Sequence, residues 1–173
     1  MDRFEKIFDY LLKVEGGYSN DKNDRGGKTK YGIIESEARE YGYKGDMRDM
    51  SLEIAREIYN KKYYHKNGLD TLKSDKIALS ICDFIVNAGK WGAKKAQAAL
   101  NELGFDLRVD GILGEKSLAA LNEVDENKFL EKYHDLQRRY YRVLAANKPS
   151  QKKFLTGWFN RVDRKENYLK EMF

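Results

Sequence analysis

The feature that most constrains the fold is an apolar segment in the middle of the chain, which runs from Ser74 or Asp75 to Asn87. Its apolar residues recur at helical spacing and would lie on nearly every side of the helix that they form. Such a helix has no polar face to turn to water, so we expect it to be the central, buried helix of the fold. Gly89 predicts its end. The apolar residues are Ile77, Ala78, Ile81, Cys82, Phe84 and Ile85.

The rest of the chain favours helices as well. One segment, residues 18–32, is polar, contains glycine and lacks periodicity, which predicts a loop or a short hairpin. A single proline, Pro149, argues against a turn-rich β-sandwich. We therefore expect an all-α fold, or an α fold with one short hairpin. The other predicted helices span residues 2–14, 35–41, 51–64, 91–103, 115–122, 125–146, and 150 or 151 to the end.

Charge and cysteine content narrow the possible partners. The chain has 33 basic and 28 acidic residues, a net charge of +5, which favours an anionic partner such as nucleic acid, an acidic membrane surface or a cell-wall polymer. A dedicated DNA clamp would usually show a denser basic stripe. The single cysteine, Cys82, excludes an intramolecular disulfide, and two scattered histidines give no zinc spacing. We expect neither a metal nor another cofactor.

The N-terminal residues predict where the protein is made. Asp2 and Glu5 lie in a segment without an apolar core, which does not resemble a signal peptide. No stretch approaches the roughly 18 apolar residues of a membrane span. We expect synthesis in the cytoplasm without stable membrane insertion, and export or holin-type release if the substrate lies in the periplasm or outside the cell.

Glu15 is the first candidate for chemistry. On a helical wheel it lies roughly 20° from Phe4 and Phe8 and roughly 40° from Leu11, on the face that enters the core. A buried carboxylate either finds a cation or has its pKa raised and stays protonated. A protonated carboxylic acid is what protonation of a glycosidic oxygen requires. The alternative is that the helix end frays and Glu15 contacts a nearby lysine or arginine.

A second carboxylate follows on the predicted loop. Asp24 comes nine residues after Glu15 and is followed by Gly26, Gly27 and Thr29. A carboxylate that faces the first would be a base, a nucleophile or an electrostatic stabiliser in glycosidase chemistry. The glycines let the backbone approach a ligand, and the Thr29 hydroxyl could position a water. A plain turn explains the same residues when they are taken alone.

These motifs resemble a known family. The runs EGGYSN (residues 15–20) and DRGGKTKYGI (residues 24–33) resemble the N-terminal signature of glycoside hydrolase family 108. Its members are phage-lysozyme-like N-acetylmuramidases, some of them described as secretion activators. DFIVNAG (residues 83–89) resembles the family's central helix, and FLTGWFNR (residues 154–161) its C-terminal segment, so the resemblance covers nearly the whole chain.

The resemblance implies a lysozyme-like helical domain around the central helix, with Glu15 as the catalytic acid. The spacing Glu-x8-Asp-x4-Thr also resembles the Glu/Asp/Thr triad of phage lysozymes, which have one more residue before the threonine. That departure leaves the roles of Asp24 and Thr29 less defined than that of Glu15. Arg25 stands where the family often has proline.

A second resemblance lies further along the chain. Residues 109–121, VDGILGEKSLAAL, are similar to the Asp-Gly-x-x-Gly turn and helix of peptidoglycan-binding modules, although a turn followed by a helix cap explains them as well. We expect residues 1–92 to form a lysozyme-like catalytic region. Residues 93–173 would form a helical, peptidoglycan-binding-like region packed on it as one compact unit.

Five further residues are candidates for substrate binding. Asp83 and Asn87 lie four residues apart, on one face of the central helix, and either line a saccharide cleft or brace the Glu15 loop from behind. Tyr31 and Trp158 could stack on sugar rings, with core packing as the alternative for Trp158. Tyr18 belongs to the signature that contains Glu15.

The predicted activity is hydrolysis of the β-1,4 bond between N-acetylmuramic acid and N-acetylglucosamine by a monomer that binds peptidoglycan glycan strands and no nucleic acid. Glu15 would protonate the leaving oxygen, and Asp24 would assist a water or the developing oxocarbenium ion. Two alternatives remain open. One is a lytic transglycosylase that uses the same glutamate. The other is a non-catalytic module that binds cell wall or nucleic acid through Lys94-Lys95 and Arg138-Arg139.

Overall fold

The computed structural model of the chain describes residues 2–15, 17, 19–20 and 27–172. By the contacts between its residues the chain divides into two compact units, Met1–Lys66 and Asn67–Phe173, and each is described by itself. The division into functional regions at residue 92 stays a prediction. No helix among the described residues is both long enough and apolar enough to cross a bilayer.

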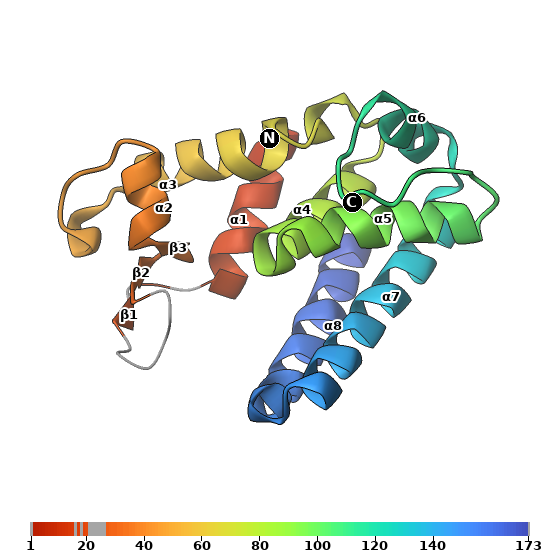
Figure 1. The fold of residues 1–173 in the computed structure, drawn as a ribbon. Coiled ribbons are helices and arrows are strands. Elements are labelled where there is room, and N and C mark those ends of the chain that lie inside the picture. Colours follow the sequence, from red (N-terminus) through yellow and green to blue (C-terminus); the bar gives the residue numbers. More distant parts are fainter. Residues whose placement is uncertain (1, 16, 18, 21–26, 173) are drawn as a thin grey trace. The chain divides into compact units, whose positions relative to one another are not determined.

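The first unit combines helices with a small sheet (Figure 1). Phe4 and Phe8 of its first helix are buried and contact Tyr64 and Tyr59, respectively, at ring-centroid distances of 5.2 and 5.8 Å. The elements, in order, are α1 (Arg3–Glu15), β1 (Ser19–Asn20), β2 (Lys28–Lys30), β3 (Ile33–Ile34), α2 (Glu35–Glu40), η1 (Met47–Asp49), α3 (Leu52–Tyr59) and η2 (Asn60–His65).

The sheet is antiparallel, with strand order β1-β2-β3. Thr29 lies opposite Ser19 on one side and Ile34 on the other. The third strand goes beyond the short hairpin that the sequence predicts, and it forms because the chain turns back within two residues. Tyr31 and Gly32 both have positive φ, 53° and 78°, as a tight two-residue hairpin turn requires.

The helix predicted over residues 51–64 changes type along its length. Ser51 caps α3 by accepting a hydrogen bond from the Ile54 N–H, at 3.2 Å. After Tyr59 the chain continues as the π-helix η2. In this wider turn the Tyr63 hydroxyl donates to the buried carboxylate of Glu37 at 2.5 Å, and Lys62 pairs with the same oxygen at 2.6 Å.

The second unit is helical throughout its described elements, and its centre is α4. Every residue from Ile77 to Ile85 is buried, which confirms the predicted central helix. Ser74 caps it by accepting a hydrogen bond from the Ile77 N–H, at 3.1 Å. The elements, in order, are η3 (Leu69–Thr71), α4 (Asp75–Ala88), α5 (Lys90–Glu102), α6 (Glu115–Glu123), α7 (Glu126–Asn147), η4 (Pro149–Phe154) and α8 (Leu155–Met172).

Helices α4 and α5 approach very closely. Gly89 ends α4 with a φ of 61°, in the left-handed region that favours glycine. A Cβ added to Gly92 of α5 would lie 2.6 Å from the backbone nitrogen of Ile85, closer than any real side chain could come. The Tyr133 hydroxyl of α7 donates to the Gly92 carbonyl at 2.9 Å, so a third helix holds this junction in place.

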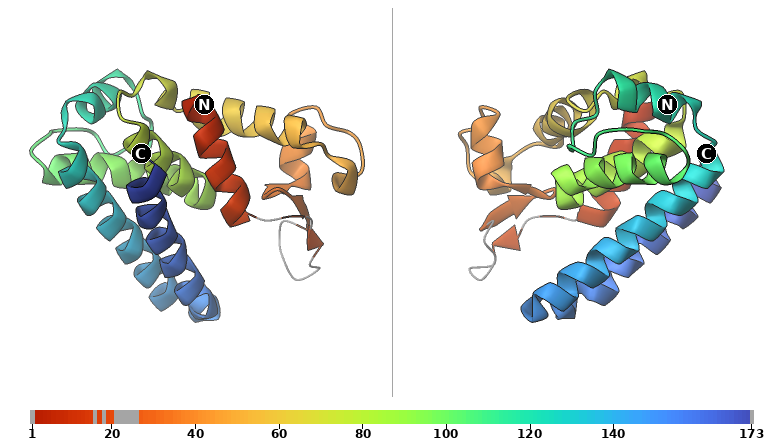
Figure 2. Two further views of the ribbon diagram at one scale, coloured as in Figure 1. Left: turned by 180° about the vertical axis from the view of Figure 1, so that it is seen from behind. Right: turned by 45° about the vertical axis from the view of Figure 1, so that its right-hand side comes forward.

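The last two helices, α7 and α8, run side by side (Figure 2). Asp125 caps α7 by accepting from the Lys128 N–H at 2.9 Å. The last helix was expected to begin at residue 150 or 151. Instead, Pro149 begins the 3-10 helix η4, and α8 starts only at Leu155. The fold class is confirmed: an α fold with a small antiparallel sheet.

Candidate functional site

The end of α1 is the first part of the candidate site. The helix extends to Glu15, and Phe4, Phe8 and Leu11 are all buried, so the face whose periodicity includes position 15 enters the core of the first unit. Glu15 therefore occupies a helix C-terminus, where the backbone dipole is negative and disfavours an ionised carboxylate. The Glu15 side chain lies outside what the structure describes.

The small sheet positions the second part. Asp24 and Tyr18 both lie outside the described residues. Asn20 pairs with Lys28, and Asp24 lies midway between these two residues in the sequence. Thr29 is half-buried in the middle strand.

Chain connectivity keeps these residues in one region. Ser19 follows Glu15 by four residues, so their Cα atoms are at most about 14 Å apart. Thr29 is the partner of Ser19 across the strands, a step of roughly 5 Å. The end of α1 and the strand that holds Thr29 are thus neighbours by connectivity alone.

Tyr31 has a strained backbone. It is the one non-glycine residue with positive φ in the described part of the chain. The Tyr59 hydroxyl donates to the Tyr31 carbonyl at 2.6 Å, and the Lys30 ammonium lies 5.2 Å from the centre of its ring. A tyrosine held in this region costs about 1–2 kcal/mol, and such strain tends to gather at functional sites. Tyr31 thus keeps its place as a candidate contact residue in the first unit.

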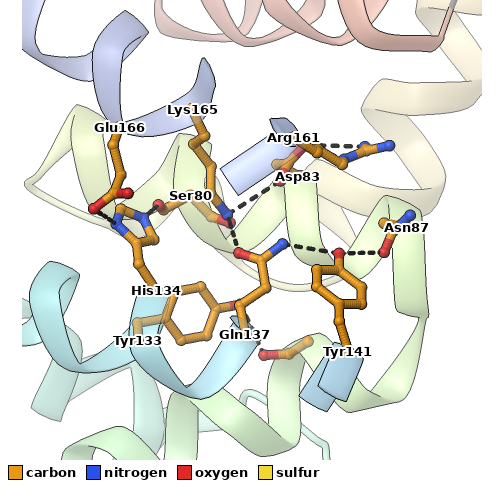
Figure 3. A network of polar contacts seen from close by, with 11 residues as sticks. Ser80, Asp83, Asn87, Tyr133, His134, Gln137, Tyr141, Arg161, Lys165 and Glu166 are labelled. Carbon is orange, nitrogen blue, oxygen red and sulfur yellow. Dashed lines mark hydrogen bonds and ion pairs between the residues drawn. The ribbon is translucent and has the colours of Figure 1, made fainter. Parts of the chain in front are cut away.

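Asp83, in contrast, is an internal ion-pair partner. Its side chain is 0% exposed and lies 2.9 Å from Arg161 and 3.1 Å from Lys165, both on α8 (Figure 3). Burial alone would raise the pKa of Asp83, but the two cations outweigh it and hold the pKa below its usual value. The carboxylate offers no exposed atom to a sugar in this structure, and we assign it the role of joining α4 to α8.

The ion pair extends into a larger network. Lys165, also 0% exposed, donates to the Ser80 carbonyl at 3.1 Å and to the Gln137 side chain at 2.6 Å. Gln137 donates to the Tyr141 hydroxyl at 3.0 Å, and Tyr141 donates to Asn87 at 2.5 Å. The Asn87 side-chain oxygen is thereby bound within the protein, and this chain of contacts links three helices (Figure 3).

Trp158 lies at the edge of the same cluster. Its half-buried ring stacks on Tyr141 with centroids 5.1 Å apart and an interplanar angle of 20°. Asn87 and Trp158 thus meet through Tyr141, whereas Asp83 faces α8. Of the residues predicted to bind substrate, the structure brings these two together, and both contact Tyr141.

Ser80, His134 and Glu166 form a row like that of a hydrolase triad. Ser80 Oγ lies 2.5 Å from His134 Nε2, and Glu166 lies 3.6 Å from Nδ1 (Figure 3). Burial lowers the pKa of His134 to about 4, and the contacts with His134 and Arg138 lower that of Glu166 to about 2. Ser80 is fully buried on α4, where no substrate can reach a nucleophile, so we assign the row a structural role.

The turn that resembles peptidoglycan-binding modules is internally satisfied. Gln97 of α5 donates to Asp110 at 3.0 Å and to Ser117 at 3.1 Å, and it accepts from the Gly111 N–H at 2.9 Å. Asp110 also accepts from the Ile112 N–H at 2.9 Å. These contacts hold the motif residues in a turn that is followed by the start of a helix.

Sequence reasoning missed an exposed aromatic surface on the second unit. Trp91 of α5 is 47% exposed, and the centre of its ring lies 5.9 Å from the centre of the Tyr140 ring of α7. The signal was a tryptophan followed within four residues by Lys94 and Lys95 on a helix that is otherwise alanine-rich. In the described part of the chain, no three His, Cys, Asp or Glu side chains gather as metal ligands would.

Comparisons with known proteins identify the chain's relatives. Residues 8–89 match the family "Glycosyl hydrolase 108", and residues 92–163 match the family "Predicted Peptidoglycan domain". The solved structure of Brucella abortus SagA is similar over 96% of this chain and 94% of that one, with 25% sequence identity and a TM-score of 0.80. A search of curated proteins found no match. The N-terminal half of the chain is therefore similar to the glycosyl hydrolase 108 family and the segment after it to a peptidoglycan domain, and these matches point to the hydrolysis or binding of peptidoglycan.

Proposed function

We propose that the protein is a lysozyme that hydrolyses the β-1,4 bond between N-acetylmuramic acid and N-acetylglucosamine, with Glu15 as the general acid. The observation that carries the proposal is the position of Glu15 as the last residue of α1, within the segment that matches the hydrolase family. A helix C-terminus, where the backbone dipole is negative, favours a protonated carboxylic acid over a carboxylate.

The reaction needs one proton and one water. Glu15 gives its proton to the glycosidic oxygen, which leaves as the 4-hydroxyl of N-acetylglucosamine while the bond to C1 of N-acetylmuramic acid breaks. A water then supplies the hydroxyl group at C1 and releases one proton. Asp24 assists this water or stabilises the developing oxocarbenium ion, and the Thr29 hydroxyl positions the water. The anomer of the first product, read by NMR, distinguishes inversion from retention.

The replacement Glu15→Gln tests the proposal. It keeps the size of the side chain and removes the transferable proton, so the rate of lysis should fall at least about a hundredfold. Turbidity of a cell-wall suspension measures the rate, and thermal unfolding shows whether the variant is folded. Glu40→Gln is the matched control, since Glu40 is an exposed glutamate of the same unit and its replacement changes the charge equally.

Each alternative predicts a different result. A lytic transglycosylase would lose activity on Glu15→Gln as well, but the wild type would release 1,6-anhydro products, which mass spectrometry detects. A non-catalytic wall-binding module would show no lysis in the wild type. A Glu15→Gln variant that lyses walls at the wild-type rate would refute the assignment of the acid.

A further inference from the structure

The second unit has an apolar groove between α5 and α7. It has a volume of about 550 Å³, within the range of pockets that hold small ligands. Its walls include Trp91 and Lys95 of α5 and Tyr140 and Val143 of α7. Val143 is 57% exposed, so the groove presents apolar side-chain surface to water.

Two of the residues that line the groove, Trp91 and Tyr140, form an aromatic platform. The rings of Trp91 and Tyr140 are inclined at 36° to each other. Behind them Tyr140 contacts Phe84 at 5.5 Å and Tyr141 at 5.6 Å, so the platform is anchored in the core and its geometry is fixed. Pyranose rings have one apolar C–H face, and a rigid aromatic surface is the partner that such a face needs.

Positive charge surrounds the platform. The ammonium groups of Lys94 and Lys95 lie 4.7 and 5.8 Å from the centre of the Trp91 ring. Neither forms an ion pair with an acid in the described part of the chain. Arg139, which also lines the groove, pairs only with the exposed Asp135, at 3.1 Å, a contact of small strength that a ligand can replace.

We propose that this groove binds the glycan strand of peptidoglycan. A sugar ring would stack on Trp91 and Tyr140, and the carboxylates of the peptide stem would contact Lys94 and Lys95. The inference rests on the proposed function, in that peptidoglycan is the substrate. It locates wall binding away from the Asp110-Gly111 turn, whose polar groups are taken up by Gln97.

The arrangement of charges favours this ligand over nucleic acid. Arg138, the other basic residue beside the groove-lining Arg139, is bound to Asp163 at 2.6 Å and to Glu166. Of the residues that line the groove, two are cations, Lys95 and Arg139, and they lie next to apolar side chains. A polyanionic backbone needs a longer row of cations, whereas an amino sugar with one carboxylate cluster does not.

Trp91 fluorescence tests the groove directly. The chain has two tryptophans, so Trp91 is the sole tryptophan in a Glu15→Gln, Trp158→Phe background, which keeps an aromatic ring against Tyr141. Titration with the soluble disaccharide tetrapeptide of peptidoglycan should change its emission saturably. The neutral sugar chitotetraose should bind at least about tenfold more weakly, because it lacks carboxylates. Emission unchanged by the disaccharide tetrapeptide would overturn the proposal.

Sedimentation with intact cell walls gives the second test, again in the Glu15→Gln background. The double replacement Lys94→Glu, Lys95→Glu should weaken wall binding at least about tenfold, and Trp91→Ala should weaken it comparably. Lys152→Glu with Lys153→Glu is the charge-matched control on η4, and Ile112→Ala is the control for the exposed Asp-Gly turn. Each control should change binding less than about twofold.

The outcomes separate this inference from the proposed function. Equal losses in both lysine pairs would assign binding to net charge and refute the groove, and so would a loss confined to Ile112→Ala. Competition by an oligonucleotide but not by wall fragments would make nucleic acid the ligand, and a Trp91 signal that depends only on protein concentration would indicate a second copy of the chain. All these readouts use a variant without the proposed acid, so failure of the catalytic proposal shows only in the lysis assay.

Discussion

In the unit Met1–Lys66 most of the described ion pairs lie at the surface, whereas in Asn67–Phe173 the strongest lie inside. Lys61–Glu57 and Arg48–Asp46 are open to solvent in the first unit. In the second, Asp83 and Lys165 have no exposed side-chain surface at all. The backbones of the two units also differ. The first unit has short strands and a tyrosine with positive φ, whereas the second has long regular helices.

This contrast concerns how much stability depends on single residues in each unit. A surface pair contributes little, about 0–1 kcal/mol, so the first unit can vary its surface charges at little cost in stability. Loss of one partner from a buried pair costs much more, about 3–5 kcal/mol, because the other charge is left without compensation. The stability of the second unit therefore depends on a few residues, and these are poor candidates for contact with substrate.

Asp83→Asn is the strongest test of the contrast. It removes the negative charge that pairs with the fully buried ammonium of Lys165, so the free energy of unfolding should fall by about 3–5 kcal/mol. Asp135→Asn, which removes only the exposed partner of Arg139, should cost less than about 0.5 kcal/mol. Urea denaturation measures both. If Asp83→Asn stayed fully stable but lost affinity for sugar, the carboxylate would be a substrate ligand and the contrast would fail.

Acid should destabilise the second unit through His134. Burial lowers the pKa of His134 from 6.5 to about 4. Between pH 4 and pH 6.5 the histidine is therefore protonated in the unfolded chain and neutral in the folded one. Stability should therefore fall by about 3 kcal/mol as the pH drops from 6.5 to 4. Below pH 4.5 the depressed pKa of Glu166 adds a further loss, because its protonation removes its ion pairs.

The His134→Gln variant should flatten the slope of stability against pH between 4 and 6.5. His65→Gln, a replacement of the exposed histidine in the first unit, is the control and should leave the slope unchanged. Denaturation midpoints across this pH range measure the effect. An equally steep slope in the His134→Gln variant would place the acid sensitivity elsewhere.

Asp24→Asn should affect the rate more than binding. If Asp24 acts on the attacking water or on the developing cation, its charge matters in the transition state, and turnover should fall at least about tenfold. Affinity for walls should stay nearly constant in a sedimentation assay. Unchanged turnover in the folded variant would make Asp24 a turn residue and leave Glu15 without its second carboxylate.

Only a small effect on stability is expected for Tyr31→Asn. Asparagine tolerates positive φ, so relief of strain and loss of ring contacts should nearly cancel, to within about 1 kcal/mol. Lysis should nevertheless weaken if the ring contacts sugar, while Tyr31→Phe should retain it. A variant that is more stable and equally active would show that the strain serves only the turn.

The regular helices could be predicted from the sequence because their signals are local. The apolar pattern between Ile77 and Ile85 predicts the helix α4, and Ser74 before it and Gly89 after it predict its two ends. The third strand and the π-helix η2 could not be predicted in this way. The first depends on a tyrosine in a glycine-like conformation, and the second lies within a pattern of ordinary helical periodicity.

Features made by distant residues were harder to predict. The Asp83–Arg161 contact joins positions 78 residues apart, although an acid on an all-round apolar helix required a cation from somewhere. Arg161 and Lys165, four residues apart, were the visible counterpart. The groove at Trp91 could not be foreseen, because exposure of that ring depends on how α5 and α7 pack.

The close approach at Gly92 sets a limit on how this sequence can vary. Even a methyl group there would collide with backbone atoms of α4, and backbone cannot rotate away as a side chain can. In a library that samples every amino acid at every position, position 92 should accept glycine alone, while the neighbouring position 91 should accept many residues without loss of folding. Replacements at position 92 should lower the abundance of folded protein. Replacements at position 91 should leave abundance unchanged and weaken attachment to cell walls.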